Sequence, residues 1–377
     1  MNRAQRRAAS RHTDRPANHR RAAALGSAAL LATAGGGAAL VVAAGAPAGA
    51  NATIVVDSLT DDGTGTTLRD AITQANTDAG QDTITFSVTG TITLASDLPR
   101  IDEGVLIQGP GASSLTVDGD GNQMFVFFGI STSEYDSAVS GLTLTGGNAD
   151  GANYLSRGGA IVKAYNNGNL TISDCVITGN SATSEGGGIS LYDTRGDVTI
   201  TDTVVSDNYS GLSGGGLAAS DNDPGHELHV TVTGSTFSDN TAFNAGGGVW
   251  MRHGVIDVTD TSVTGNDAFY FGGGGVYLND VEANLTGVSI DGNTTGSVGG
   301  GVRAIAATVT VVDSTVSDNV SERAGGGLYF GTSTVTIESS TISGNQAGYY
   351  GGGLYLDVDA VSTTIRNSTI SSNTAGN

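Results

Sequence analysis

Apolar and polar residues alternate in short runs along most of the chain. Val230 and Val232 flank the polar Thr231, and the same apolar–polar–apolar order returns later, as in Val309-Thr310-Val311. A period of two residues is typical of a β-strand that buries one face and exposes the other. Gly, Asn and Asp end each run after a few residues, so the strands are short and joined by turns. The pattern therefore predicts an all-β protein.

A tetrad that starts with an apolar residue and ends in Asn recurs eight times, and a glycine run follows each of the first seven copies. The eight Asn residues are Asn180, Asn208, Asn240, Asn266, Asn293, Asn319, Asn345 and Asn373. Most copies are roughly 26 residues apart, and each has room for about three short strands with their turns. A propeller of the WD40 type needs copies of about 40–45 residues. The repeat therefore predicts a parallel β-helix with about three strands per coil.

Stacking of the coils gives the repeated residues structural roles. Equivalent residues of successive coils lie about 4.8 Å apart, so inward Asn side chains can bond amide to amide along the stack. The seven residues from Asn180 to Asn345 are therefore predicted to be structural. Four Asp residues lie six positions before their Asn and are predicted to be turn residues: Asp174, Asp202, Asp260 and Asp313.

The two ends of the repeat differ. Apolar residues at 68, 71, 72 and 75 have helical spacing, and Thr67 with Asp70 forms a capping box, which predicts a short helix that caps the first coil. We divide the chain into this cap with irregular first coils (51–140) and the regular repeats (141–377). No capping pattern follows Asn373, so we expect either a longer protein or a partner at the open last coil.

Residues 1–50 have the pattern of a cleaved export signal. Seven Arg residues in the first 21 positions precede an uncharged run rich in Ala, Leu, Val and Gly, which ends in Ala48-Gly49-Ala50. Arg20-Arg21 also permits a twin-Arg route. We expect an exported protein, extracellular or on the cell surface. No other run is long and apolar enough to span a bilayer, so no membrane span is expected in the mature chain.

The charge of the chain excludes one class of partner. The sequence has 37 acidic and 16 basic residues, and 7 of the bases and 1 of the acids precede residue 51, which leaves 36 against 9, or −27. A surface this acidic repels phosphate backbones, so nucleic acid is not an expected partner. Cys175 is the only cysteine, and its place in a predicted strand indicates a buried, inert thiol.

Two sequence motifs resemble those of known exported bacterial proteins. The segment Thr66-Thr67-Leu68-Arg69-Asp70-Ala71-Ile72 resembles the CSLREA motif, with Thr66 at the Cys position and Asp70 at the Glu position. Gly158-Gly159-Ala160-Ile161 and Phe237-Ser238-Asp239-Asn240 are similar to the two half-motifs of polymorphic outer-membrane-protein repeats. The resemblance implies a right-handed parallel β-helix, export, and commonly a surface or adhesive role. It implies no reaction, because β-helix proteins include lyases, hydrolases and adhesins.

Carboxylate pairs are the candidates for catalysis, because glycosidases use two acidic side chains. The candidates are Asp221 with Asp223, Asp280 with Glu282, and Asp357 with Asp359, all expected in loops after the glycine-linked strand. Polygalacturonase-like elements are incomplete: Asn76-Thr77-Asp78 occurs alone. Acidic loop residues are more often simply solvated, and we favour a protein that is not an enzyme.

No cofactor or metal site is expected, although the acidic charge leaves Ca²⁺ as a weak prediction. Asp118-Gly119-Asp120-Gly121-Asn122 lacks the later ligands of a calcium loop, so a β-turn is the preferred interpretation. His226, His229 and His253 could approach one another, but their spacing does not match a helical metal motif, and a chance cluster is favoured.

Aromatic residues supply the best functional candidate. The outward position two residues after the glycine run holds Trp250, Tyr277, Arg303, Tyr329 and Tyr355 in five successive copies, and nearby turns add Phe243, Tyr270 and Tyr349. Such a stripe could bind a glycan or a surface protein, because aromatic rings stack on sugar and peptide surfaces. The alternative is cross-coil packing that only stabilises the sheet. We therefore predict an adhesin-like binding protein, with a polysaccharide lyase or glycoside hydrolase and a purely structural spacer as alternatives.

Overall fold

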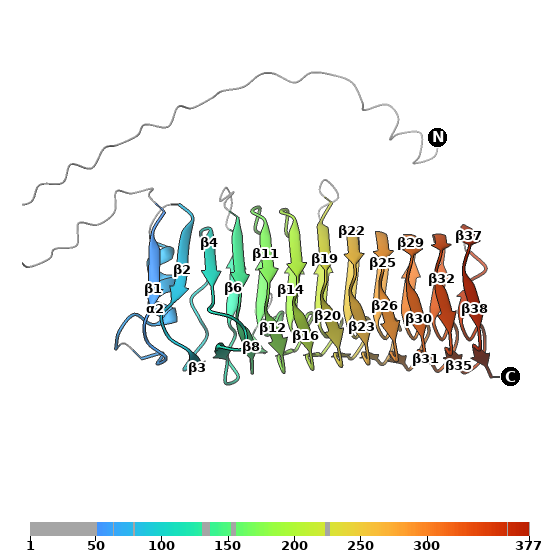
Figure 1. Cartoon of the computed structure of the whole chain (residues 1–377), viewed down its shortest axis with the longest axis horizontal. Helices are drawn as coiled ribbons and strands as arrows, with labels where there is room; N and C mark the ends of the chain where they lie inside the picture. Colours follow the sequence, from blue (N-terminus) through green and yellow to red (C-terminus); the bar gives the residue numbers. More distant parts are fainter. Residues whose placement is uncertain are drawn as a thin grey trace, which may run out of the picture. The chain divides into compact units, whose positions relative to one another are not determined.

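The computed structural model describes residues 51–62, 64–77, 80–129, 136–151, 156–222, 227–359 and 361–376. These residues form a parallel β-helix, in which the strands of successive coils lie side by side from β1 to β39 (Figure 1). The predicted signal peptide (1–50) and the candidates Asp78, Asp223 and His226 lie outside the described residues.

Three sheets run along the stack, and we name four strand columns within them. Faces A1 and A2 belong to one 19-stranded sheet, face B has 11 strands, and face C has 9. Face A1 comprises β6 (Phe125–Phe128), β10 (Ile161–Ala164), β14 (Ile189–Tyr192), β18 (Leu217–Ser220), β28 (Val302–Ile305), β32 (Leu328–Gly331) and β36 (Leu354–Leu356). Face A2 comprises β1 (Thr53–Val56), β2 (Asp82–Phe86), β4 (Val105–Gln108), β7 (Ser137–Ser140), β11 (Leu170–Ser173), β15 (Val198–Thr201), β19 (His229–Thr233), β29 (Thr308–Val312), β33 (Thr334–Glu338) and β37 (Ser362–Arg366).

Faces B and C are built from shorter strands. Face B comprises β3 (Gly90–Thr93), β5 (Leu115–Asp118), β8 (Thr143–Thr145), β12 (Val176–Thr178), β16 (Val204–Ser206), β20 (Thr236–Ser238), β23 (Ser262–Thr264), β26 (Ser289–Asp291), β30 (Thr315–Ser317), β34 (Thr341–Ser343) and β38 (Thr369–Ser371). Face C comprises β9 (Asn148–Ala149), β13 (Ser181–Ala182), β17 (Tyr209–Ser210), β21 (Thr241–Ala242), β24 (Asp267–Ala268), β27 (Thr294–Thr295), β31 (Val320–Ser321), β35 (Gln346–Ala347) and β39 (Thr374–Ala375).

Two coils differ from the others in a way that matters for the candidate site. In β22 (Val249–Thr259) and β25 (Val276–Thr286), one strand of 11 residues runs through both face A1 and face A2. These coils therefore have the expected three strands, whereas most other regular coils have four. The corner between the two faces is kept in both kinds of coil, because His253 and Asp280 have φ of 59° and 56°, close to the 52° of Ala306. The predicted all-β solenoid is confirmed.

Buried Asn side chains form the predicted ladder inside the stack. Asn240 Nδ2 donates to Asn266 Oδ1 at 3.0 Å and to the Val205 carbonyl at 2.9 Å, and the Asn240 backbone N–H donates to the same Asn266 oxygen at 3.0 Å. The same amide-to-amide bond links each Asn to the next from Asn180 to Asn373. Each side chain thus satisfies its own polar groups and those of the turn beside it.

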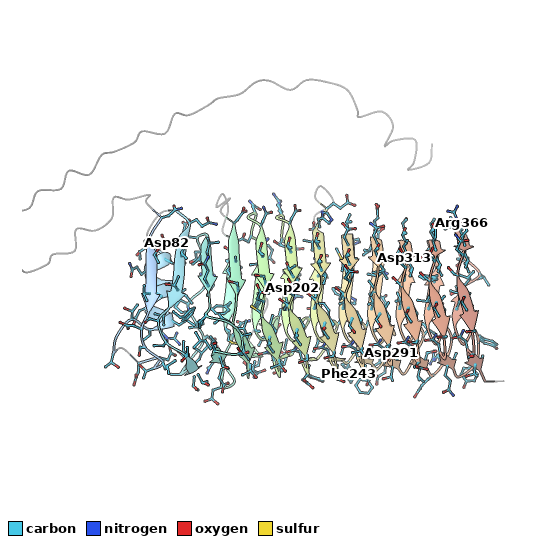
Figure 2. The ribbon with its side chains drawn as sticks, viewed as in Figure 1. Asp82, Asp202, Phe243, Asp291, Asp313 and Arg366 are labelled. Carbon is cyan, nitrogen blue, oxygen red and sulfur yellow. The ribbon has the colours of Figure 1, made fainter. Side chains whose placement is uncertain are left out.

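The predicted Asp turns are also confirmed, since Asp202 has φ of 47° and its three equivalents have similar positive values. Asp239 is another turn residue with positive φ, and its side chain reaches toward Gly265 in the next coil. Glycine is needed at that position. A Cβ at Gly265, which has φ of 65°, would lie only 2.6 Å from Asp239 Oδ1. Figure 2 labels Asp202 and Asp313, two of these turn residues, at separate coils of the stack.

The interior between the sheets is filled mainly by Ile, Val and Leu, but it also holds the ionisable side chains of Lys163 and Cys175. Lys163 points inward on β10, is 1% exposed, and donates to the Asn166 carbonyl at 3.1 Å and to Thr194 Oγ1. Burial lowers the pKa of Lys163 to about 7, although Asp197 and Asp136 act in the opposite direction. Cys175 is buried as predicted, and burial raises its pKa to about 11.

Helix α2 (Leu68–Ala75) covers the first coil. Its capping box forms as predicted: Asp70 N–H donates to Thr67 Oγ1 at 3.1 Å, and Thr67 N–H donates to Asp70 Oδ2 at 3.2 Å. The helix buries its apolar side against β1 and β2, at the blue end of the stack in Figure 1. No helix in the described ranges has the length and apolar character needed to cross a membrane.

The last coil exposes side chains that are buried in earlier coils. Ile365 and Ile370 are 40% and 46% exposed, whereas their register partners Ile337 and Ile342 are buried.

Candidate ligand-binding cleft on the aromatic face

The predicted aromatic stripe is a column of aligned residues on face A1. Ser190, Ala218, Trp250, Tyr277, Arg303, Tyr329 and Tyr355 are register partners in successive strands. The alignment is therefore confirmed, while ligand binding by these residues stays a prediction. Two parts of this column have different surroundings.

The C-terminal part of the column is a stack whose ring faces cover one another. The Arg303 guanidinium lies 5.4 Å from the Tyr277 ring centroid and 5.6 Å from that of Tyr329. Tyr329 and Tyr355 stack at 5.4 Å with an interplanar angle of 15°. Arg303 Nη1 also donates to the Phe271 carbonyl. The faces of these rings are thus occupied by cation–π and ring contacts, as the packing alternative requires.

Asp357 accepts a hydrogen bond from one ring of this stack. The Tyr329 hydroxyl donates to Asp357, and this bond together with burial raises the pKa of Tyr329 to about 12. The same bond, with one from the Val358 N–H, holds the pKa of Asp357 below its usual value. Asp357 is thereby engaged as a hydrogen-bond acceptor.

The N-terminal part of the column borders an open cleft of about 300 Å³. Its lining residues are Ser213, Asn244, Ala245, Trp250, Arg252, Phe271, Tyr277 and Asn279. Trp250 and Tyr277 come from β22 and β25, and Arg252 and Asn279 lie two residues further along the same strands. Asn244 and Phe271 come from the turns between face C and face A1, where the Phe271 N–H donates to the Asn244 carbonyl at 2.7 Å.

The neighbour of Trp250 toward the N-terminus is small. Ala218 is its register partner on β18, so no ring or guanidinium on that strand position covers the indole from this side. Trp250 is half-exposed. The cleft thus combines an aromatic platform with amide, hydroxyl and guanidinium groups, which is the composition of a small-ligand site.

Sequence reasoning missed several residues of this cleft. Arg252 and Asn279 could have been predicted, because the period of two residues places them on the same outward face as Trp250 and Tyr277. Asn244 carries no such signal, since only the stacking of its turn against the next one brings it to the cleft.

The other predicted aromatic residues lie at the corner between face C and face A1. Phe243, which Figure 2 labels, is 4.9 Å from Tyr270 between ring centroids and 6.4 Å from Phe269. Tyr349 lies further along the stack, 6.3 Å from Tyr350, which in turn lies 6.3 Å from Tyr355. All but Tyr355 are exposed, so two aromatic clusters flank the column.

A further aromatic group, which sequence reasoning missed, lies near the N-terminal end of face A1. Tyr165 packs edge-on against Phe128 and Tyr192 at 5.7 and 5.5 Å. Arg157 covers the Tyr192 ring at 4.0 Å and pairs with Glu185 at 2.9 Å. This group resembles the C-terminal stack in having covered rings.

The candidate carboxylates do not line the cleft in the described part of the chain. Asp280 and Glu282 lie within β25 and not in a loop as expected, because the single residue Asp280, with φ of 56°, forms the corner between face A1 and face A2 in this coil. Asp221 is buried in a turn, Asp359 is exposed, and Asp357 accepts the Tyr329 bond. Catalysis by these residues stays a prediction.

The histidines within the described ranges pair with separate carboxylates. His229 Nε2 lies 2.8 Å from Asp257 Oδ2, and His253 Nε2 lies 3.5 Å from Asp280 Oδ2. Bonds from His229 and Asn284 keep the pKa of Asp257 below its usual value despite partial burial. Among the described residues, no group of three His, Cys, Asp or Glu side chains is arranged to hold a metal ion. The weak Ca²⁺ prediction is not tested by this observation.

The Asp118–Asn122 segment forms the preferred β-turn. The Asn122 N–H donates to the Gly119 carbonyl at 2.8 Å, and Asp120 and Gly121 between them both have positive φ.

Comparison with known protein families agrees with this architecture. The sequence matches the family described as the right-handed β-helix region over residues 107–267 and 227–376. The chain belongs to the right-handed β-helix family. Handedness, which the sequence resemblance implied, is thereby confirmed, whereas membership of the CSLREA type stays a prediction.

Several solved structures are similar to this β-helix, and the proteins they belong to differ in kind. The A-module of mannuronan C-5 epimerase AlgE4 from Azotobacter vinelandii is 16% identical, with 82% of this chain and 92% of that chain covered and a TM-score of 0.46. PfbA, a surface adhesin of Streptococcus pneumoniae, is 11% identical, with 82% and 88% covered and a TM-score of 0.45. Pectate lyase Pel9A is 10% identical, with 83% and 79% covered and a TM-score of 0.42. A search of curated proteins finds no match.

Proposed function

We propose that this protein is an exported β-helix that binds a glycan in the cleft beside Trp250. The observation that carries the proposal is the cleft itself: an aromatic platform with four polar side chains, Ser213, Asn244, Arg252 and Asn279, around a volume of about 300 Å³. A sugar ring offers an apolar C–H face to the indole and hydroxyl groups to amides, so both kinds of lining group are used.

A surface protein is the other ligand that the sequence left open. Stable protein interfaces bury about 800 Å² on each partner, usually over a broad patch. The cleft is small and concave, which fits a sugar ring better than such a patch. We therefore place the glycan first.

Binding is proposed here in preference to polysaccharide cleavage or a purely structural role. In the described residues none of the candidate carboxylates lines the cleft, so a bound sugar would meet amides and an Arg before any acid. A spacer would need no concave site of this composition. Export, surface attachment and an adhesive role are part of the proposal and rest on the sequence of residues 1–50 and on the resemblance described above.

The test is retention of the purified protein in native gels that contain single soluble polysaccharides. Trp250→Ala should reduce affinity for the retaining polymer by about 5- to 30-fold, because a stacked platform contributes about 1–2 kcal/mol. Tyr355→Ala is the matched control: it removes an aromatic residue of the same column from the covered stack, and should leave retention unchanged. Thermal unfolding of both variants checks that the fold is intact.

Three outcomes separate the candidates. Retention that Trp250→Ala abolishes supports the proposal. Release of reducing sugar or unsaturated product from the polymer would instead support an enzyme. Equal retention of the wild type and Trp250→Ala would contradict binding in this cleft. Capture of a surface protein that competes with no polysaccharide would mean that the ligand is a protein and not a glycan.

A further inference from the structure

The charges around the cleft select among glycans. Arg252 is the one charged residue in the cleft lining. Its guanidinium contacts Asn222 Oδ1 at 3.5 Å, and both the backbone and side-chain N–H groups of Asn222 donate to Asp193 Oδ1 at 2.9 Å. A carboxylate therefore lies one residue behind this cation, while the nearby Arg303 is already held between the Tyr277 and Tyr329 rings.

Carboxylates also flank the cleft along the strand. Asp280 and Glu282 follow Asn279 on β25, and both are exposed. Asp280, with φ of 56°, forms the corner between the face A1 and face A2 parts of β25, and Glu282 follows on face A2. A polymer that leaves the cleft along this strand therefore meets these two carboxylates next. The charge of −27 downstream of residue 50 adds a repulsive long-range field.

We propose that the ligand is a neutral polysaccharide and not a polymer of uronic acids, a refinement that rests on the proposed glycan binding. A uronate polymer has one carboxylate on every sugar. Arg252 can pair with one of these, but the neighbouring sugars then lie within a Debye length, about 8 Å, of Asp280 and Glu282. A neutral polymer meets no such repulsion and still uses the Trp250 platform, Asn244 and Asn279.

The test compares neutral polymers (mixed-linkage β-glucan, xylan and mannan) with anionic ones (polygalacturonate and alginate) in the same native gels. We expect retention by at least one neutral polymer, with an affinity that changes less than about twofold between low and high salt, because no ion pair is screened. Retention by an anionic polymer alone, weakening with salt, would overturn this inference but leave glycan binding intact. Absence of retention by every polymer would overturn both proposals.

Two variants give a sharper test. Asp280→Asn with Glu282→Gln removes the flanking charges outside the cleft lining, and should allow weak, salt-sensitive retention by polygalacturonate without weakening neutral binding. Arg252→Gln removes the charge but keeps a shorter hydrogen-bonding side chain, and should weaken neutral binding by about two- to tenfold without making it depend on salt. Loss of all binding in Arg252→Gln at unchanged thermal stability would mean that the ligand is recognised as an anion, which overturns the inference.

Discussion

The buried Asn ladder and the outward column of face A1 both run through the regular coils, yet the ladder is uniform and the column varies. The ladder holds the same residue in every regular coil, from Asn180 to Asn373. The outward column changes from the buried Ser190 and Ala218 to the partly exposed Trp250, Tyr277 and Arg303. Both are spaced by the same coil repeat.

The difference follows from what each side chain needs from its neighbour. An inward amide has no water beside it, so it must find its hydrogen-bond partners in the neighbouring coils, and another Asn at the same position supplies both a donor and an acceptor at the right distance. An outward side chain is solvated on one side and can change without leaving a polar group unpaired. Variation on face A1 therefore creates both the covered Tyr–Arg stack and the open cleft.

The largest expected effect breaks the ladder at its centre. Asn266→Ala removes the acceptor of two Asn240 N–H groups and the donor to the Phe237 carbonyl, all of them buried. The free energy of unfolding, measured in urea, should fall by about 4 kcal/mol. Asn284→Ala, an outward Asn, is the control and should cost less than about 1 kcal/mol. Equal losses in the two variants would show that position in the ladder has no special weight.

A second variant tests the one ionisable side chain in the interior of face A1. The pKa of Lys163 is about 7 in the fold and 10.5 in the unfolded chain, so between these values the unfolded state binds more protons and stability rises with pH. Lys163→Met should remove this rise, which amounts to about 3 kcal/mol between about pH 6 and about pH 9. Urea unfolding at the two pH values measures it. Parallel pH profiles for the wild type and Lys163→Met would contradict a depressed pKa.

A third variant concerns the turns that let the coils stack. Gly265→Ala places a side chain at φ of 65° and within 2.6 Å of Asp239 Oδ1, and should destabilise the fold by about 2 kcal/mol. In an Asp239→Gly background the contact is absent and only the backbone cost, about 1 kcal/mol, should remain. The thermal midpoints of the four proteins form the cycle, and an unchanged cost in both backgrounds would argue against the contact.

The smallest effect tests the covered stack of face A1. Tyr329→Phe removes the bond to Asp357 and should raise the pKa of that carboxyl toward its ordinary value, which NMR titration can follow. Because the bond lowers the Asp357 pKa in the fold, its contribution is present above about pH 4 and is lost as the pH falls through the folded value. We expect at most about 1 kcal/mol at neutral pH, and no effect on glycan retention. Tyr355→Phe is the matched control, and reduced retention in Tyr329→Phe would extend the binding site into the stack.

Much of the fold could be predicted because the repeated Asn residues show which positions of successive coils lie beside one another. Once the coils are aligned on Asn208, Asn240 and Asn266, the alternation of apolar residues determines which side chains enter the core, and the Thr67–Asp70 pair marks the capping helix. The continuous strands β22 and β25 were not foreseen, since the corner at His253 and Asp280 depends on the left-handed backbone conformation of two polar residues and not on a periodic pattern.

The coil repeat, the inward and outward positions and the alignment of Trp250 with Tyr277 follow from periodicity along one dimension, so the amino-acid sequence is enough to predict them. The folded chain is needed to show that Arg303 covers the Tyr277 and Tyr329 rings, that Ala218 leaves one side of Trp250 uncovered, and that Asn244 and Phe271 line the cleft. Those features depend on side-chain packing between turns of neighbouring coils, and no spacing along the chain encodes how far a side chain reaches over its neighbour.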